Sequence, residues 1–219
     1  MRVLLALTLL AASVRIVPAA GPPREISFAT ADGGTVVADV YGDGSTDGVV
    51  LAHGAAFDKE SWRPLAETLA AEGHRVLALD FRGHGRSRAG SAQDGLAEDL
   101  LAAVGWLRHA GLGRVAIVGA SLGGRAAAEA AAAAPPGEID RVVLLSPAAI
   151  PEPEQVRGAT LLVASAEEPG VAQMKAAYAR TPGPRRIVLL PGSAHAQHIF
   201  ETDQAAALTT AIVDFLGGR

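Results

Sequence analysis

The chain has 219 residues, of which 19% are charged, and its formal net charge is −4. This length is enough to bury a sizeable core without disulfides or metal, and the sequence contains no cysteine. The basic residues form no cluster, which argues against nucleic acid as the partner.

The amino-terminal segment is typical of a secretory signal peptide. Met1 and Arg2 precede an apolar run over residues 3–12, and small residues close the segment just before Gly21. The apolar run is shorter than a typical membrane-spanning helix. We therefore expect residues 1–20 to be a signal peptide, residues 21–219 to form one domain, and the protein to be exported, either periplasmic or secreted. An uncleaved membrane anchor and a misassigned start codon, with a cytoplasmic protein, are the alternatives.

Strand and helix patterns alternate along the rest of the chain. Two segments around Asp32, Gly33 and Gly34 predict a hairpin, and short apolar strands then alternate with helical patterns. The hairpin strands are residues 25–30 and 35–41, the later strands are 49–52, 75–79, 115–118, 141–145, 160–164 and 187–190, and the clearest helices are 95–109 and 125–134. Near-continuous apolar strands between helices predict an α/β fold with a mostly parallel sheet covered on both faces.

A serine stands at one of the predicted strand-to-helix junctions. Gly119 and Gly123 flank Ser121 at two residues' distance, between the strand 115–118 and the alanine-rich helix. Small residues permit a tight turn that holds a serine hydroxyl out toward a substrate, and the helix amino terminus favours negative charge there. Ser121 is therefore a candidate nucleophile.

A nucleophilic serine needs a base, and six histidines compete for that role. Four of them have other plausible places, at strand ends, before a strand or in the last turn of a helix: His53, His74, His84 and His109. His195 and His198 follow the final predicted strand, on a loop that can bring an imidazole to Ser121. We favour His195, which small residues flank, and expect His198 at the start of the last helix. The spacing of these two histidines, with Glu201, is not a strong zinc signature, so no metal is expected.

The orienting acid is expected on the loop after the strand 160–164. Glu167 and Glu168 lie there, between the serine and the histidine in chain order. Glu152 and Glu154, after the preceding strand, are the alternative positions for the acid.

Taken together, these landmarks resemble those of the α/β-hydrolases. The resemblance rests on the serine turn, on the order serine, acid, histidine, on residues 51–55 with His53 and Gly54, and on the loop from Asp80 to Ser87. It covers nearly the whole chain beyond the amino-terminal segment. The sequence departs from the family's usual pattern in offering glutamate rather than aspartate as the acid, and the resemblance assigns that role to Glu168.

The resemblance also implies two backbone donors for an oxyanion and a function. The donors are the N–H groups of Leu122 and Ala55, with Ala56 as the fallback for Ala55. The implied protein is a serine hydrolase of small carboxylic esters or thioesters, which works through an acyl-enzyme without a cofactor. Its partner is a small-molecule ester, with no nucleic acid and no stable membrane partner. An amidase or peptidase of the same fold, and an inactive binding protein, are the alternatives.

The segment between the strands 141–145 and 160–164 predicts the shape of the site. Many α/β-hydrolases carry a cap there, whereas this chain has only residues 146–158, with three prolines. We therefore expect no cap domain and an open cleft for small, soluble or surface-presented esters, without preference for long acyl chains.

Overall fold

The protein is described by a computed structural model, which covers residues 22–218; the predicted signal peptide, residues 1–20, lies outside this range. The described chain folds around one eight-stranded sheet with the strand order β1-β2-β4-β3-β5-β6-β7-β8. The strands are β1 (Arg24–Ala29), β2 (Thr35–Tyr41), β3 (Asp47–Ala52), β4 (Arg75–Asp80), β5 (Arg114–Ala120), β6 (Arg141–Leu145), β7 (Ala159–Ser165) and β8 (Arg185–Leu190). β2 is antiparallel to β1 and β4, and the six strands from β3 to β8 are parallel to one another. The predicted hairpin and mostly parallel sheet are thus confirmed.

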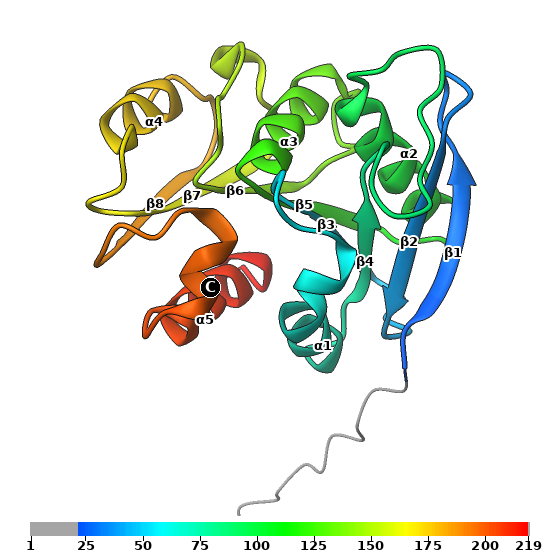
Figure 1. The fold of residues 1–219 in the computed structure, drawn as a ribbon, viewed down its shortest axis with the longest axis horizontal. Helices are drawn as coiled ribbons and strands as arrows, with labels where there is room; N and C mark the ends of the chain where they lie inside the picture. Colours follow the sequence, from blue (N-terminus) through cyan, green and yellow to red (C-terminus); the bar gives the residue numbers. More distant parts are fainter. Residues whose placement is uncertain (1–21, 219) are drawn as a thin grey trace, which may run out of the picture.

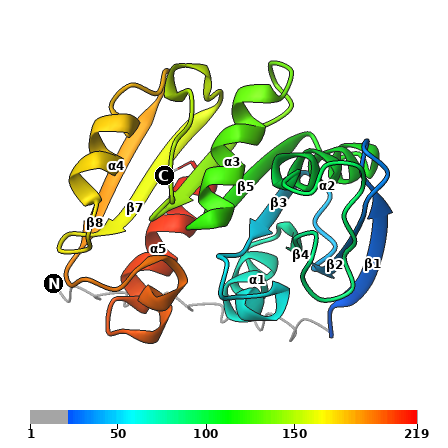
Figure 2. The ribbon, with the colours of Figure 1, turned by 45° about the horizontal axis from the view of Figure 1, so that its top comes forward.

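Helices cover both faces of the sheet, as Figure 1 shows. One face carries α2 (Leu96–His109), α3 (Leu122–Ala133) and α4 (Val171–Tyr178), and the other carries α1 (Arg63–Ala71) and α5 (Ala205–Leu216). Figure 2 shows β1 and β8 at the two edges of the sheet. Three short 3₁₀ helices complete the structure: η1 (Lys59–Trp62), η2 (Pro153–Gln155) and η3 (Ala196–Glu201). None of the helices within residues 22–218 is long and apolar enough to cross a membrane.

The strands divide their apolar side chains between two cores because successive side chains point to opposite faces. In β5, Val115 and Ile117 belong to the core beneath α2 and α3, whereas Ala116 and Val118 belong to the core beneath α1 and α5. All four side chains are at most 7% exposed. Burial on both faces explains why the parallel strands read as continuous apolar runs.

The register of the parallel strands brings their carboxyl ends together along the same end of the sheet. Ala52 of β3 pairs with Gly119 of β5, Ala120 pairs with Leu145 of β6, and Leu145 pairs with Val163 of β7. The loops that follow these strands therefore meet. Between β6 and β7 lies no cap domain, as expected, but only a loop with the three-residue η2.

The end of the chain differs from the expectation in one respect. His198 does not begin the last helix: it lies in η3, and α5 begins at Ala205. Ala196 has a φ of 53°, which turns the chain directly after His195, and Thr202 returns it to extended geometry, so the two helices are separate.

Candidate active site

Ser121 occupies a strained turn between β5 and α3. Its φ of 50° and ψ of −109° lie outside the regions that L-residues ordinarily adopt. Hydrogen bonds hold the turn on both sides: Ser121 N–H donates to the carbonyl of Leu145 at 2.9 Å, and Ala148 N–H donates to the carbonyl of Ser121 at 2.9 Å. The turn also requires glycine at position 123, because a Cβ there would lie 2.3 Å from the carbonyl oxygen of Ala52.

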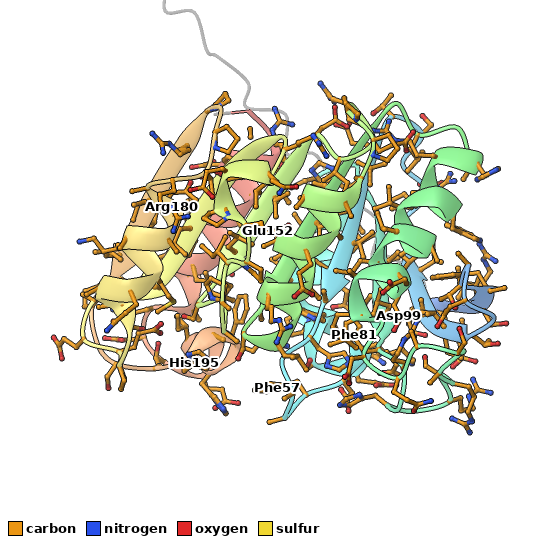
Figure 3. All side chains as sticks on the ribbon, turned by 90° about the horizontal axis from the view of Figure 1, so that it is seen from above. Phe57, Phe81, Asp99, Glu152, Arg180 and His195 are labelled. Carbon is orange, nitrogen blue, oxygen red and sulfur yellow. The ribbon has the colours of Figure 1, made fainter. Side chains whose placement is uncertain are left out.

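His195 contacts the Ser121 hydroxyl directly. Its Nε2 lies 2.9 Å from Ser121 Oγ. Figure 3 shows the imidazole at the end of the sheet where the parallel strands end. His198 is engaged elsewhere, since its Nδ1 lies 3.2 Å from Glu201 Oε2 and its ring packs on Phe57 at 4.9 Å between centroids. The two histidines therefore serve different partners, and only His195 meets the serine.

Of the candidate acids, Glu168 lies behind His195. Its Oε2 is 3.7 Å from His195 Nδ1, which is an ion-pair contact rather than a close hydrogen bond, and the Glu168 side chain is fully buried. Glu167 is exposed and only its backbone is held, by the carbonyl of Gly192. Glu154 pairs with Arg180 at 2.6 Å, and Glu152 lies well away from His195 in Figure 3.

The two expected oxyanion donors come from two segments that meet at Ser121, the start of α3 and the turn after β3. Leu122 is the first residue of α3, so its N–H has no acceptor within the helix. Ala55 follows β3, in a turn closed by a 3.0 Å hydrogen bond from Phe57 N–H to the Gly54 carbonyl. This turn lies close to the nucleophile, because a Cβ on Gly54 would lie 3.5 Å from Ser121 Cβ. Both groups can therefore face an oxygen that develops charge beside Ser121.

A family model described as the alpha/beta hydrolase fold matches residues 48–182, more than half of the chain. The chain belongs to the α/β-hydrolase family. The match spans the strands β3 to β7, and with them the turns that carry His53, Ser121 and Glu168.

Individual relatives agree with this assignment. A non-heme haloperoxidase from Rhodococcus erythropolis is 36% identical over 122 residues, which are 54% of this chain and 43% of that protein. The match thus spans less than half the length of this curated relative. Among solved structures, an esterase from Pyrococcus furiosus superposes with a TM-score of 0.77 at 21% identity, covering 89% of this chain and 92% of its own. An enol-lactonase from Burkholderia xenovorans gives a TM-score of 0.72 at 20% identity, with 88% and 100% covered. These structural likenesses show the fold.

Ser146, which the sequence does not single out, contacts the candidate acid Glu168. Ser146 directly follows β6, is fully buried, and donates its hydroxyl to Glu168 Oε2 at 2.8 Å. Its φ is 40°, and it is one of four non-glycine residues with positive φ within residues 22–218. Ser121 and Ala196 are two of the others, so three of these four unfavourable conformations surround the serine, the acid and the histidine. Backbone strain concentrated in this way is typical of a functional site.

Gln197, which the sequence also does not single out, holds the turn after β3 that carries Gly54 and Ala55. Its Oε1 accepts from Gly54 N–H at 2.7 Å, its Nε2 donates to Ser61 Oγ at 2.8 Å, and its side chain is buried. The amide thus ties the segment after His195 to the loop after β3 and to η1. Its partner Gly54 is 143 residues away in sequence, so the only local signal was its position two residues after the histidine.

His53 has a structural part in the same turn. Its Nδ1 lies 2.8 Å from the carbonyl of Gly54, and its Nε2 lies 3.1 Å from Phe81 N–H, which donates to it. Since Nε2 accepts a hydrogen bond, the proton of the neutral ring lies on Nδ1. Burial lowers the pKa of His53 to about 4, so the ring stays neutral near pH ~7. Both ring nitrogens are engaged with backbone groups, which leaves His53 no free lone pair for the Ser121 proton.

Buried polar contacts hold the loop from Asp80 to Ser87. Asp80 accepts from Lys59 N–H at 2.9 Å. The guanidinium of Arg82 is buried between Asp99 and Asp32, and these contacts hold the pKa of Asp32 well below its usual range. These groups fix the loop beside β4.

Proposed function

We propose that this protein is a serine hydrolase that cleaves small carboxylic esters or thioesters through an acyl-enzyme. The observation that carries the proposal is the 2.9 Å contact between His195 Nε2 and Ser121 Oγ, on a strained turn at the amino terminus of α3. A hydroxyl held in this way meets the geometric requirement for a nucleophile with an adjacent base.

The reaction follows from the positions of these groups. His195 Nε2 takes the Ser121 proton as Oγ bonds to the substrate carbonyl carbon, and the oxyanion receives hydrogen bonds from Leu122 N–H and Ala55 N–H. The carbon–oxygen bond to the alcohol then breaks, and His195 gives its proton to the leaving oxygen. In the second step His195 Nε2 takes a proton from water as the water oxygen bonds to the acyl carbon. The bond from that carbon to Ser121 Oγ then breaks, His195 returns the proton to Oγ, and the carboxylic acid product leaves. In this mechanism Glu168 keeps the imidazole oriented and stabilises its charged form.

A serine-directed fluorophosphonate probe tests the nucleophile independently of the substrate. Ser121→Ala removes the reacting oxygen but little packing, so we expect a folded protein without labelling and without ester hydrolysis. Ser193→Ala is the matched control, because Ser193 is an exposed serine on the His195 loop and the variant should keep both activities. Labelling or turnover that survives in folded Ser121→Ala would show that another residue is the nucleophile.

A further inference from the structure

A cleft of about 460 Å³ opens beside His195, between the loop after β6 and helix α4. One wall is formed by residues 147–150, and the other by Pro169, Gly170 and three residues of α4: Gln173, Met174 and Ala177. Among the lining residues only Gln173 and His195 have polar side chains, and none carries a carboxylate, an ammonium or a guanidinium group. The volume lies within the range of small-molecule sites, which are mostly apolar with a few polar groups.

Both walls of the cleft are attached to the reacting groups. Ala148 N–H donates to the Ser121 carbonyl, and a Cβ on Gly124 would lie 3.0 Å from Pro147, so this loop packs on the first turn of α3. Pro169 directly follows Glu168. His195 itself lines the cleft, and its Nε2 lies 2.9 Å from Ser121 Oγ, so a group seated in the cleft lies next to the histidine that contacts the nucleophile.

The two halves of an ester need different surroundings during the reaction. The acyl group stays bonded to Ser121 through both steps, whereas the alcohol must leave and water must take its place near His195 Nε2. The His195 side chain is 49% exposed, which gives water and the leaving alcohol an open route. The apolar cleft therefore suits the acyl group, which stays bonded to Ser121 through both steps.

We propose that the cleft is the acyl-binding site and that it selects uncharged, apolar acyl groups of intermediate size. This inference rests on the serine-hydrolase function proposed above. A cleft of this volume offers an acetyl group few contacts, whereas a hexanoyl or aryl group can fill it. With no cap over the cleft, the far end of a palmitoyl chain remains in water and gains nothing. An anionic acyl group, such as a succinyl half-ester, finds no cation among the lining residues.

The test combines two ester series with matched variants of α4. One series varies the acid from acetate through hexanoate to palmitate, with a succinate half-ester, on one alcohol; the other varies the alcohol on acetate. Ala177→Phe fills the cleft, whereas Ala176→Phe places the same ring on an exposed position of α4 outside the lining. We expect Ala177→Phe to lower kcat/KM for hexanoate relative to acetate by roughly tenfold or more, and Ala176→Phe to leave the ratio unchanged. Ala149→Phe, at an exposed lining position, repeats the test if Ala177→Phe folds poorly.

The outcomes separate this inference from the proposed function. A wild-type optimum at intermediate acyl length, lost only in the cleft variants, supports it. It is wrong if the cleft variants change selectivity in the alcohol series instead, if they change neither series, or if the succinate half-ester is the best substrate. By contrast, a wild-type protein that hydrolyses no ester and takes no fluorophosphonate label would overturn the proposed function itself.

Discussion

The two sides of the nucleophile are held in different ways. On the β3 side, which is the turn after β3, neutral groups hydrogen-bond one another. Gln197 accepts from Gly54 N–H, and His53 connects the Gly54 carbonyl to the backbone after β4. On the β7 side, a buried carboxylate has few partners: Glu168 Oε2 accepts from Ser146 and faces His195, while Glu168 Oε1 has no hydrogen-bond partner. In the proposed mechanism the first side positions the oxyanion donors, and the second orients the base. The two should therefore respond differently to substitution.

The largest effect should come from substitution of His195, the base in the proposed mechanism. His195→Ala removes the base and should lower kcat/KM by roughly 10⁴- to 10⁶-fold, because Ser121 then keeps its proton. His198→Ala, in the same segment, should lower it much less, since His198 contacts Glu201 and Phe57 rather than the serine. Steady-state kinetics on one ester compares the two variants. Equal losses would mean that His198 also takes part in proton transfer.

The next effect concerns the acid. Glu168→Gln keeps the shape of the side chain but removes its charge, and we expect a loss of roughly 10²- to 10⁴-fold in kcat, with a smaller change in KM. Glu167→Gln is the control, because Glu167 is exposed and should be nearly silent. The reverse ranking would move the acid by one residue and contradict the geometry of the β7 side.

On the β3 side, the neutral His53 should make stability depend on pH. The folded pKa of His53, about 4, lies below the ordinary value of about 6.5. Between these values the unfolded chain binds a proton that the folded protein does not, so the contribution is fully present above about pH 6.5 and is lost as pH falls toward 4. The whole contribution is about 3 kcal/mol. Urea unfolding of wild type and His53→Gln across this range should show their difference in unfolding free energy shrinking at low pH; a constant difference would contradict the neutral assignment.

The next substitution removes the hydrogen bonds by which Gln197 holds the turn after β3. Gln197→Met keeps the length of the side chain but cannot accept from Gly54 N–H or donate to Ser61. We expect kcat to fall by roughly 10- to 100-fold with KM little changed, because a displaced donor acts mainly on the transition state. Gln204→Met is the control, since the Gln204 side chain donates its hydrogen bond to the neighbouring Asp203 rather than to the turn after β3.

A transition-state analogue separates this role from a purely structural one. A trifluoromethyl ketone forms an oxyanion on Ser121, so it should bind Gln197→Met more weakly in proportion to the loss of kcat. Unchanged affinity for the ketone in a folded variant would show that Gln197 does not position the oxyanion donors.

Comparison with the sequence shows which parts of such a site can be predicted. The strands and the serine turn were predictable because local patterns specify them: apolar runs bounded by loops, and glycines flanking Ser121. The antiparallel placement of β1 and β2 beside β4 agrees with the predicted hairpin. These features depend on residues that are neighbours in the chain.

The supporting residues were not predictable for the opposite reason. Gln197 acts on Gly54 and Ser61, and Ser146 acts on Glu168 across two adjacent strand ends. A lone glutamine or serine has no local signature, and its importance appears only when tertiary packing buries it against a specific partner. The missing cap predicted an open cleft, but not its apolar lining, because the two walls come from separate loops and α4.

The smallest predicted effect separates strain from chemistry on the β7 side. Ser146 keeps a φ of 40° although glycine would adopt it more readily, and its buried hydroxyl contacts the acid. Ser146→Ala retains the unfavourable backbone without the hydroxyl, whereas Ser146→Gly removes both. We expect the glycine variant to be more stable than the alanine variant by about 1 kcal/mol in urea unfolding. Both should nevertheless lose a similar, roughly three- to tenfold, part of kcat/KM, because both leave the buried carboxylate with one donor fewer. If activity instead follows stability, and the glycine variant works as well as wild type, then Ser146 only closes the turn after β6 and the carboxylate does not need its hydroxyl.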